Sequence, residues 1–344
     1  MMMKRLFCSM LVCFFGISVV GAQNVAPINP NASKEARALL NYLYKISAQK
    51  KTLSGIHNVI GRMSENVDDL YKITGKYPAI WGGDFGFADS THDIDNIKYR
   101  PLLVPEIKKQ FANGAIVVMT YHQANPVMGE PTPFEGGVIS KLTDQQWKEL
   151  LTPGTPLYKK WCAQMDLLAA KLKELQEAKI PVIFRPYHEM NGDWFWWGGR
   201  KGSNGFIALW NQLYDYYTNH HHLNNLLWAW TSDKPKLGVE DFFPGIDKVD
   251  LLGCDIYPQK DVEEVYPQEW YDRMHKLAGG KPLALTENSI LPTLQQLKKQ
   301  PWVWFMLWSE KSFKLNKTED IKTVFNSKAV ITRDEIKPIY KNRK

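Results

Sequence analysis

The chain has 344 residues, of which 44% are hydrophobic, 23% charged and 12% aromatic, which is typical of a globular protein and excludes an intrinsically disordered one. The formal net charge is +7 at pH 7, and Lys4, Arg5 and the basic segment 337–344 contribute much of it. Since no other long stripe of Lys and Arg interleaved with aromatic residues occurs, the charge does not indicate a nucleic-acid partner.

The first predicted element is a secretory signal peptide over residues 1–22. Two basic residues precede the apolar run Leu6–Val20, and small residues up to Ala22 form a cleavage site. A membrane-spanning helix needs about 20 apolar residues, so this run of about 15 is too short, and no second run follows. We therefore expect residues 23–344 to form a secreted or periplasmic protein without a membrane anchor.

Only two cysteines follow the predicted signal peptide. Cys162 and Cys254 allow at most one disulfide, and whether they pair is left open by the sequence. The stability of the fold must therefore come from a hydrophobic core.

Eight short apolar runs in the remaining chain have the composition of strands that are buried on both faces. In chain order they are Thr52–His57, Ala79–Asp84, Ala115–His122, Pro181–Glu189, Asn225–Thr231, Val249–Tyr257, Pro282–Glu287 and Val303–Trp308. Helix-like stretches lie between them, among them Lys159–Ala178, Ile207–Tyr217 and Pro267–Ala278. Eight strands alternating with helices along one uninterrupted chain predict a single (β/α)8 barrel of the α/β class rather than a doubly wound open sheet.

Ionisable residues gather at the carboxyl ends of the predicted strands, which is the catalytic face of such a barrel. They are His57, Asp84, His122, His188, Glu189, Asp255 and Glu287. The longest connection, Gln123–Leu157, is rich in Gly and Pro and lies on the same face, so we expect a binding loop. Within it, Trp147 either stacks on a ligand or packs the loop.

In the segment Phe184–Gly198 the fourth strand runs into a cation, an imidazole, a carboxylate and an amide, and then into four consecutive aromatic side chains, Trp194–Trp197. Burying Arg185, His188 and Glu189 without partners would cost several kcal/mol each. These side chains must therefore satisfy one another or face a cleft.

Two carboxyl groups that flank one bond are the requirement for cleaving a glycoside. Glu287 ends the seventh strand, nearly opposite the fourth in an eight-stranded barrel, so its side chain and that of Glu189 reach toward a common axis. We expect Glu189 to be the general acid/base, because desolvation beside Trp194 and the opposing charge favour its protonated form, and Glu287 to be the nucleophile. A separation of about 5–5.5 Å between the two carboxyl groups would give retention of configuration.

The run from His188 to Gly192, followed by Trp194 and Trp197, resembles the signature of glycoside hydrolase family 26. The resemblance implies a retaining (β/α)8 enzyme that needs no cofactor and no metal. It also implies β-1,4-mannan as the substrate, because β-mannanases dominate the family. Glu189 after strand four and Glu287 after strand seven match the positions of the acid/base and the nucleophile.

The same resemblance implies that further residues contact or support the sugar: His122, His188, Trp194, Asp255, Tyr257 and Trp308. The Tyr257 hydroxyl would hold the nucleophile, and Trp308 would form the floor under the sugar. Ser309 departs from the pattern, because some mannanases of the family have an Arg there. Any of these residues can instead serve packing or backbone hydrogen bonding, and the role of Asp84 with Trp81 is left open.

Other functions fit part of the pattern. Within the family, mixed-linkage β-glucanase and β-1,3-xylanase activities remain alternatives, and endo and exo action cannot be separated. A metal-dependent barrel hydrolase could use His57, His122, His188 and Asp84, but the chain lacks the usual metal motifs and Glu287 would be unexplained. A non-catalytic carbohydrate-binding barrel need not keep both carboxylates. We expect a monomer whose partner is β-mannan or a manno-oligosaccharide.

Overall fold

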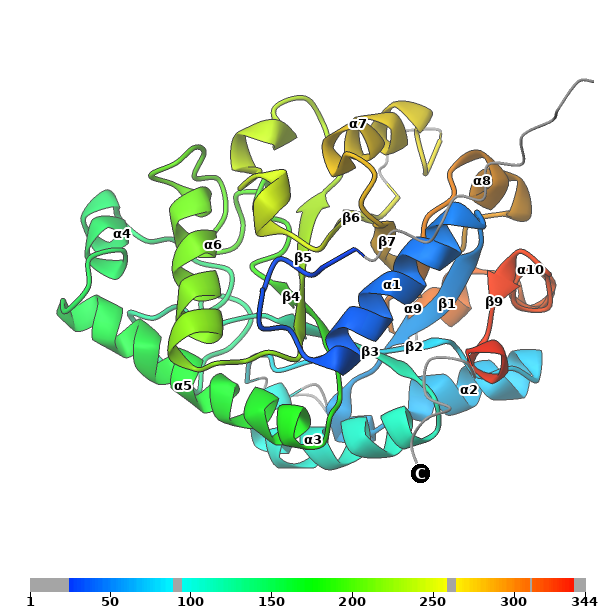
Figure 1. Cartoon of the computed structure of the whole chain (residues 1–344), viewed down its shortest axis with the longest axis horizontal. Coiled ribbons are helices and arrows are strands. Elements are labelled where there is room, and N and C mark those ends of the chain that lie inside the picture. The colour runs from blue at the N-terminus through cyan, green and yellow to red at the C-terminus, as the bar shows by residue number, and fades with distance from the viewer. Residues whose placement is uncertain (1–24, 89–94, 259–263, 310, 337–344) are drawn as a thin grey trace, which may run out of the picture.

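A computed structural model describes residues 25–88, 95–258, 264–309 and 311–336 (Figure 1). The predicted signal peptide, residues 1–22, lies outside the described residues. Within them, no helix is both long enough and apolar enough to cross a bilayer.

Eight parallel strands close a barrel in the described part of the chain. They are β1 (Thr52–His57), β2 (Ile80–Asp84), β3 (Ile116–Tyr121), β4 (Val182–Pro186), β5 (Leu226–Asp233), β6 (Leu251–Ile256), β7 (Leu283–Asn288) and β8 (Trp304–Leu307). Each strand pairs in parallel with the next, and β8 pairs with β1, which closes the sheet. The predicted (β/α)8 barrel is therefore confirmed, and each predicted strand overlaps an observed one. A short strand that was not predicted, β9 (Val330–Ile331), adds to β1 from outside the closed ring.

Helices lie between the strands and cover the outside of the barrel (Figure 1). They are α1 (Lys34–Ala48), α2 (Glu65–Thr74), α3 (Asn96–Ala112), α4 (Asp144–Leu150), α5 (Pro156–Glu177), α6 (Phe206–Asp215), α7 (Gln268–Ala278), α8 (Leu294–Lys299), α9 (Lys311–Leu315) and α10 (Thr318–Phe325). The three helix-like stretches of the sequence correspond to α5, α6 and α7. Helix α6 runs on into a π-helical turn, Tyr216–His220, which explains why the sequence pattern extends to Tyr217.

Local sequence signals set the ends of these helices. Thr155 caps α5, because its side chain accepts a hydrogen bond from the backbone N–H of Tyr158, and Pro156 fits the first helical position. Gly75 ends α2 with a φ of 70°, a left-handed conformation that glycine adopts without strain.

Alternate residues of the strands serve two separate cores. Outward-facing residues such as Trp81 and Phe184 pack under the surrounding helices, and inward-facing residues such as Ile80 and Ile183 fill the barrel. The apolar face of α1, including Leu43, joins the inner core, and α1 lies across the barrel in Figure 1. Since the strands run in parallel, the ionisable residues that the sequence places at their carboxyl ends meet at the opposite end of the barrel.

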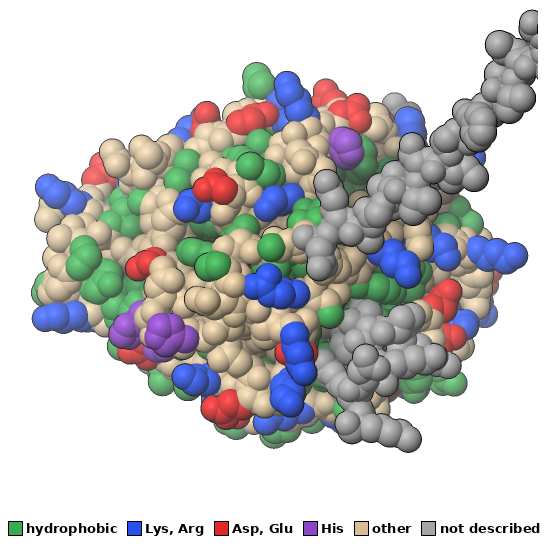
Figure 2. Space-filling model, in the orientation of Figure 1, with side chains coloured by type: hydrophobic (Ala, Val, Ile, Leu, Met, Phe, Trp, Pro, Cys, Tyr) green, Lys and Arg blue, Asp and Glu red, His purple; other side chains and the backbone are tan. Residues whose placement is uncertain are grey.

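The surface on the side of α1 shows Lys and Arg side chains interspersed with Asp and Glu, without a continuous basic stripe (Figure 2). Cys162, which is half-buried, and Cys254, which is buried, are both free thiols, which answers the question that the sequence left open.

Candidate active site

A cavity of about 1150 Å³ opens at the carboxyl ends of the strands. Seven of the eight residues that the sequence singled out for the site line it: His122, His188, Glu189, Trp194, Tyr257, Glu287 and Trp308. The eighth, Asp255, is completely buried and does not line the cavity. His57 and Asp84, to which the sequence analysis assigned no firm role, also face the cavity.

The backbone at the end of β4 adopts an unusual conformation that places Glu189 at the cavity wall. Tyr187 and Glu189 have φ values of 52° and 54°, in the left-handed region that costs non-glycine residues about 1–3 kcal/mol. The Tyr187 hydroxyl accepts a hydrogen bond from Trp161 Nε1 (2.8 Å), and the Glu189 N–H donates to the Thr231 carbonyl (2.9 Å). These contacts hold the turn, which the apolar pattern of β4 could not reveal.

Strand β7 carries an irregularity where it delivers Glu287. The register with β6 shifts so that Asp255 faces Glu287, and the register with β8 shifts between Leu285 and Asn288. A β-bulge turns the side chain that follows it. Here the bulge directs Glu287 into the cavity, while Asn288 Oδ1 accepts the N–H of Met306 on β8 (3.1 Å).

Both carboxylate oxygens of Glu287 accept a hydrogen bond. Arg185 Nη1 donates to Oε1 (2.8 Å), and the Tyr257 hydroxyl donates to Oε2 (2.7 Å). A guanidinium and a phenol are the donors that suit an ionised carboxylate. The contact expected between Tyr257 and the second glutamate is therefore present.

Arg185 links the buried part of the site, although the sequence assigned it no individual role. Its Nη2 donates to Asp255 Oδ2 (2.7 Å), and Asp255 Oδ1 accepts from the Thr286 hydroxyl (2.6 Å). Arg185 also donates to the hydroxyls of Thr120 and Thr231. The signal that could have identified it is a cation inside an apolar strand, because such a charge needs buried partners.

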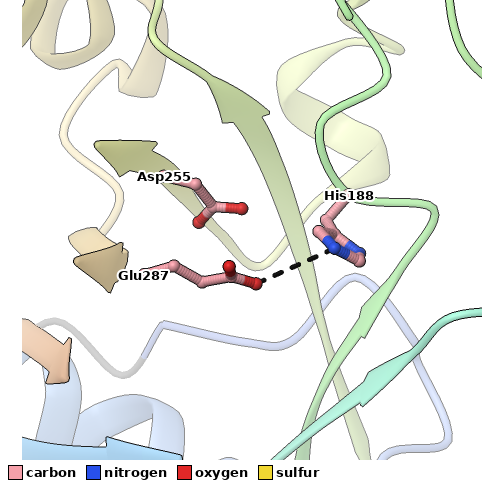
Figure 3. A group of neighbouring side chains, drawn as sticks. All are labelled: His188, Asp255 and Glu287. Atoms are coloured by element: carbon pink, nitrogen blue, oxygen red, sulfur yellow. Dashed lines mark ion pairs between the residues drawn. The ribbon is translucent and has the colours of Figure 1, made fainter. Parts of the chain in front are cut away.

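His188, Asp255 and Glu287 lie together as metal ligands often do, with candidate ligand atoms within 4.8 Å of one another (Figure 3). The Nε2 atom of His188 lies 3.8 Å from Glu287 Oε1. However, the four carboxylate oxygens of Asp255 and Glu287 already accept hydrogen bonds, two of them from Arg185. The donor set therefore fits an arginine-centred ion-pair network better than a metal site.

Glu189 has a different environment from Glu287. Its Oε2 accepts a hydrogen bond from Trp194 Nε1 (3.0 Å). Burial raises the pKa of Glu189 well above its ordinary range, and the negative charges of Asp255 and Glu287 raise it further. Glu189 thus tends to keep its proton, whereas Glu287 is surrounded by hydrogen-bond donors. A general acid beside a nucleophile needs this difference.

The imidazoles of His57, His122 and His188 form one wall of the cavity, and burial favours the uncharged form of the first and the last. Burial lowers the pKa of His188 well below its ordinary range and that of His57 to about 3, although Asp84 opposes the shift at His57. His57 stacks on Trp308, with ring centroids 3.8 Å apart, and His122 meets His188 edge to face at 4.4 Å. Uncharged imidazoles can donate and accept hydrogen bonds, as a ligand with hydroxyl groups requires.

Asp84 has a role that the sequence left open. Its carboxylate contacts Nδ1 of His122 and also accepts the His122 backbone N–H (3.2 Å). Burial raises the pKa of Asp84, but the nearby imidazole of His122 with its hydrogen bonds, and then that of His57, bring it down to about 2. Ionised Asp84 therefore fixes the orientation of the His122 ring.

The Gly- and Pro-rich connection forms part of the cavity wall through Pro133, Phe134, Glu135 and Ile139. Trp147 does not reach the cavity. It is buried, its Nε1 donates to the Asn204 carbonyl (3.0 Å), and the Arg200 guanidinium lies over its ring. Of the two interpretations of Trp147, packing is the one observed.

Comparison with known proteins places the chain among carbohydrate-active enzymes. The family model for glycosyl hydrolase family 26 matches residues 28–335. A mannan endo-1,4-beta-mannosidase of Bacillus subtilis (strain 168) is 30% identical over 90% of this chain and 90% of its own length. A second mannan endo-1,4-beta-mannosidase, from Thermothelomyces thermophilus, is 32% identical over 90% of this chain and 62% of its own.

Two solved structures have the same fold. GH26A from Muricauda sp. MAR_2010_75 superposes with a TM-score of 0.83 at 40% identity, covering 89% of this chain and 99% of the other. A beta-mannanase from a symbiotic protist of the termite Reticulitermes speratus, complexed with gluco-manno-oligosaccharide, superposes with a TM-score of 0.78 at 27% identity. The match covers 90% of this chain and 97% of the other.

Proposed function

We propose, since the chain belongs to glycosyl hydrolase family 26, that it hydrolyses β-1,4-mannosidic bonds of mannan or manno-oligosaccharides with retention of configuration. The relatives named as mannan endo-1,4-beta-mannosidases support β-mannan as the substrate. They also favour cleavage within the polymer over release of mannobiose from one end. Mixed-linkage β-glucan and β-1,3-xylan are the less favoured substrates.

In the first half of the reaction, a Glu287 oxygen attacks the anomeric carbon of the sugar. The bond from that carbon to the leaving oxygen breaks, and Glu189 gives its proton to this oxygen. The products are a shortened chain with a free hydroxyl and a sugar bound covalently to Glu287. Burial of Glu189 supports this step, because it keeps the acid protonated.

In the second half, Glu189 is a carboxylate and acts as a base. It takes a proton from a water molecule, whose oxygen attacks the anomeric carbon and displaces Glu287. Two inversions restore the original configuration, and both glutamates return to their starting protonation states.

The remaining residues orient the reacting groups. Tyr257 and Arg185 hold the Glu287 carboxylate from two sides. Trp308, stacked on His57, offers a flat apolar floor to the sugar ring. His122 and His188 line the cavity as partners for sugar hydroxyls, and Trp194 both contacts Glu189 and faces the substrate.

The single observation that carries this proposal is the pairing of two glutamates in one cavity, one desolvated and one held by donors. The test is incubation of the protein with mannan, galactomannan and lichenan, followed by sizing of the products. We expect a ladder of manno-oligosaccharides from mannan. Mannobiose alone would indicate exo action, and turnover of lichenan without turnover of mannan would contradict the proposed substrate.

We further propose that residues 1–22 direct export and are cleaved, so that a monomer acts outside the cytoplasm on its substrate. Mass spectrometry of the exported protein should find Gln23 at its amino terminus.

A further inference from the structure

A second cavity, of about 650 Å³, lies at the amino-terminal end of the barrel. Two of its residues, Tyr77 and Asn113, stand just before β2 and β3, whereas the site described above lies where these strands end. A five-residue strand spans about 16 Å, so the two cavities lie on opposite faces of the barrel. They share no lining residue among those described. Figure 1 shows the elements α2, α10 and β9 close together at one edge of the barrel.

Two exposed tyrosines form a flat aromatic surface in this cavity. The rings of Tyr71 and Tyr77 stack with centroids 4.3 Å apart and planes 14° from parallel. The residues are 43% and 38% exposed, so the stack does not serve the core. Exposed aromatic faces are costly in water unless they bind a partner with an apolar face, and the C–H face of a pyranose ring is such a partner.

A buried arginine stands in the wall of the same cavity with incomplete hydrogen bonding. Arg333 is only 8% exposed, its Nε donates to the Pro78 carbonyl (3.2 Å), and its guanidinium lies 5.1 Å from the Tyr77 ring centroid. Within the described ranges Nη2 has no hydrogen-bond partner, and no carboxylate forms an ion pair with Arg333. A ligand with many oxygen acceptors would supply what this donor group lacks.

The charged side chains at the rim of the cavity balance each other. Lys76 pairs with Asp334 (2.9 Å), so the rim offers one cation and one anion that neutralise each other. An anion at the rim would meet the carboxylate of Asp334. The volume falls within the range of about 300–1,000 Å³ that is typical of small-ligand sites.

We propose that Tyr71, Tyr77 and Arg333 form a second carbohydrate-binding site that holds a neutral β-mannan chain remote from the catalytic cavity. The identity of the sugar rests on the proposed function. The consequence is that a long polymer is retained on the enzyme by two contacts, which raises its effective concentration at the active site. A short oligosaccharide cannot span both sites, so its hydrolysis does not depend on the second one.

The test uses Tyr71→Ala, which removes the outer ring from an exposed helix position where alanine is well tolerated. Tyr71→Phe keeps the ring, and Leu167→Ala is the matched control, since Leu167 is also an exposed apolar residue, 56% accessible, on α5. Retention on insoluble mannan is measured with each change placed in a Glu287→Ala background, so that the polymer is not degraded. Hydrolysis of mannopentaose is measured with each change in the active enzyme.

We expect Tyr71→Ala to lower retention on mannan about three- to tenfold, in line with the loss of one stacked ring. Tyr71→Phe and Leu167→Ala should bind as the parent does, and mannopentaose hydrolysis should be the same in all active variants. Equal retention of Tyr71→Ala and Leu167→Ala on mannan would overturn the inference. Retention that depends on Tyr71 only when the polymer is anionic polygalacturonate would also overturn it. Failure of the active parent to cleave any mannan would instead reject the proposed function.

Discussion

At the scale of single residues, the site separates two glutamates by their surroundings. Glu287 lies between Arg185 and Tyr257, whereas Glu189 lies against Trp194 in a desolvated position. The difference comes from the neighbouring side chains and not from the glutamates themselves. The contribution of each neighbour to the position or the pKa of its glutamate can therefore be measured separately.

Tyr257→Phe tests the hydrogen bond to the nucleophile. The change removes only the hydroxyl that donates to Glu287 Oε2, and the loss of such a bond to a charged group costs about 1.5–3 kcal/mol. We expect kcat to fall roughly 10- to 100-fold with little change in KM, measured on mannopentaose. A loss confined to KM would show that Tyr257 binds substrate rather than positioning the carboxylate.

Asp255→Asn tests the electrostatic origin of the raised pKa of Glu189. The change removes a negative charge that raises this pKa and leaves Arg185, which lowers it, less neutralised. Both effects lower the pKa of Glu189, so the acid loses its proton at lower pH. We expect the alkaline limb of the kcat/KM profile to shift to lower pH. If the alkaline limb stayed at the same pH, a group other than Glu189 would determine its position.

At the scale of elements, much of the barrel follows from the sequence. Strands buried on both faces give continuous apolar runs, so all eight could be predicted, and long helices such as α5 showed clear periodicity. The two-residue strand β9 could not be predicted, because its pairing with β1 depends on contacts distant in the chain. The bulge in β7 and the left-handed backbone at Glu189 leave no signal in hydrophobicity, although they determine where both glutamates point.

The loop after β3 is held by a buried ion pair. Arg100 on α3 binds the Glu130 carboxylate through both Nη atoms (2.8 and 3.0 Å), and the Tyr121 hydroxyl donates to the same carboxylate (3.1 Å). The two charged side chains are only 12% and 10% exposed. Four residues further along, Phe134 lines the catalytic cavity and packs on Phe87.

Glu130→Ala should therefore destabilise the fold and loosen this wall. Removing one partner of a buried pair costs about 3–5 kcal/mol because the other charge is left uncompensated. We expect a lower midpoint of thermal unfolding and a higher KM for oligosaccharides. The double variant Arg100→Met with Glu130→Met is the control, since it removes both charges and should recover part of the lost stability. Equal destabilisation of the single and double variants would contradict this role.

At the scale of the whole molecule, one end of the barrel is closed by α1 and the other holds the reacting groups. The sequence could predict which residues reach this end, since strand order and parallel direction suffice. It could not predict that Arg185 joins Asp255 and Glu287 or that Asp84 orients His122, because these contacts join different strands. Asp255, expected among the residues that contact or support the sugar, is completely buried and accepts a hydrogen bond from Arg185.

This arrangement predicts that chelators do not affect turnover. The carboxylates of Asp255 and Glu287 are held by Arg185, Tyr257 and Thr286, and a two-carboxylate mechanism uses no ion. Prolonged dialysis against EDTA should leave the rate of mannan hydrolysis unchanged. If EDTA abolished mannan hydrolysis and a divalent metal ion restored it, the metal-dependent hydrolase would be favoured instead.

The role of Glu287 is tested most directly by mass spectrometry of the enzyme trapped with an activated 2-deoxy-2-fluoro mannoside, which slows the second half-reaction. If Glu287 is the nucleophile of a retaining enzyme, the protein gains the mass of one sugar, and peptide mapping places that mass on Glu287. A label on Glu189 or on another residue, or rapid turnover that gives an inverted product without a covalent intermediate, would contradict the assignment of Glu287 as the nucleophile.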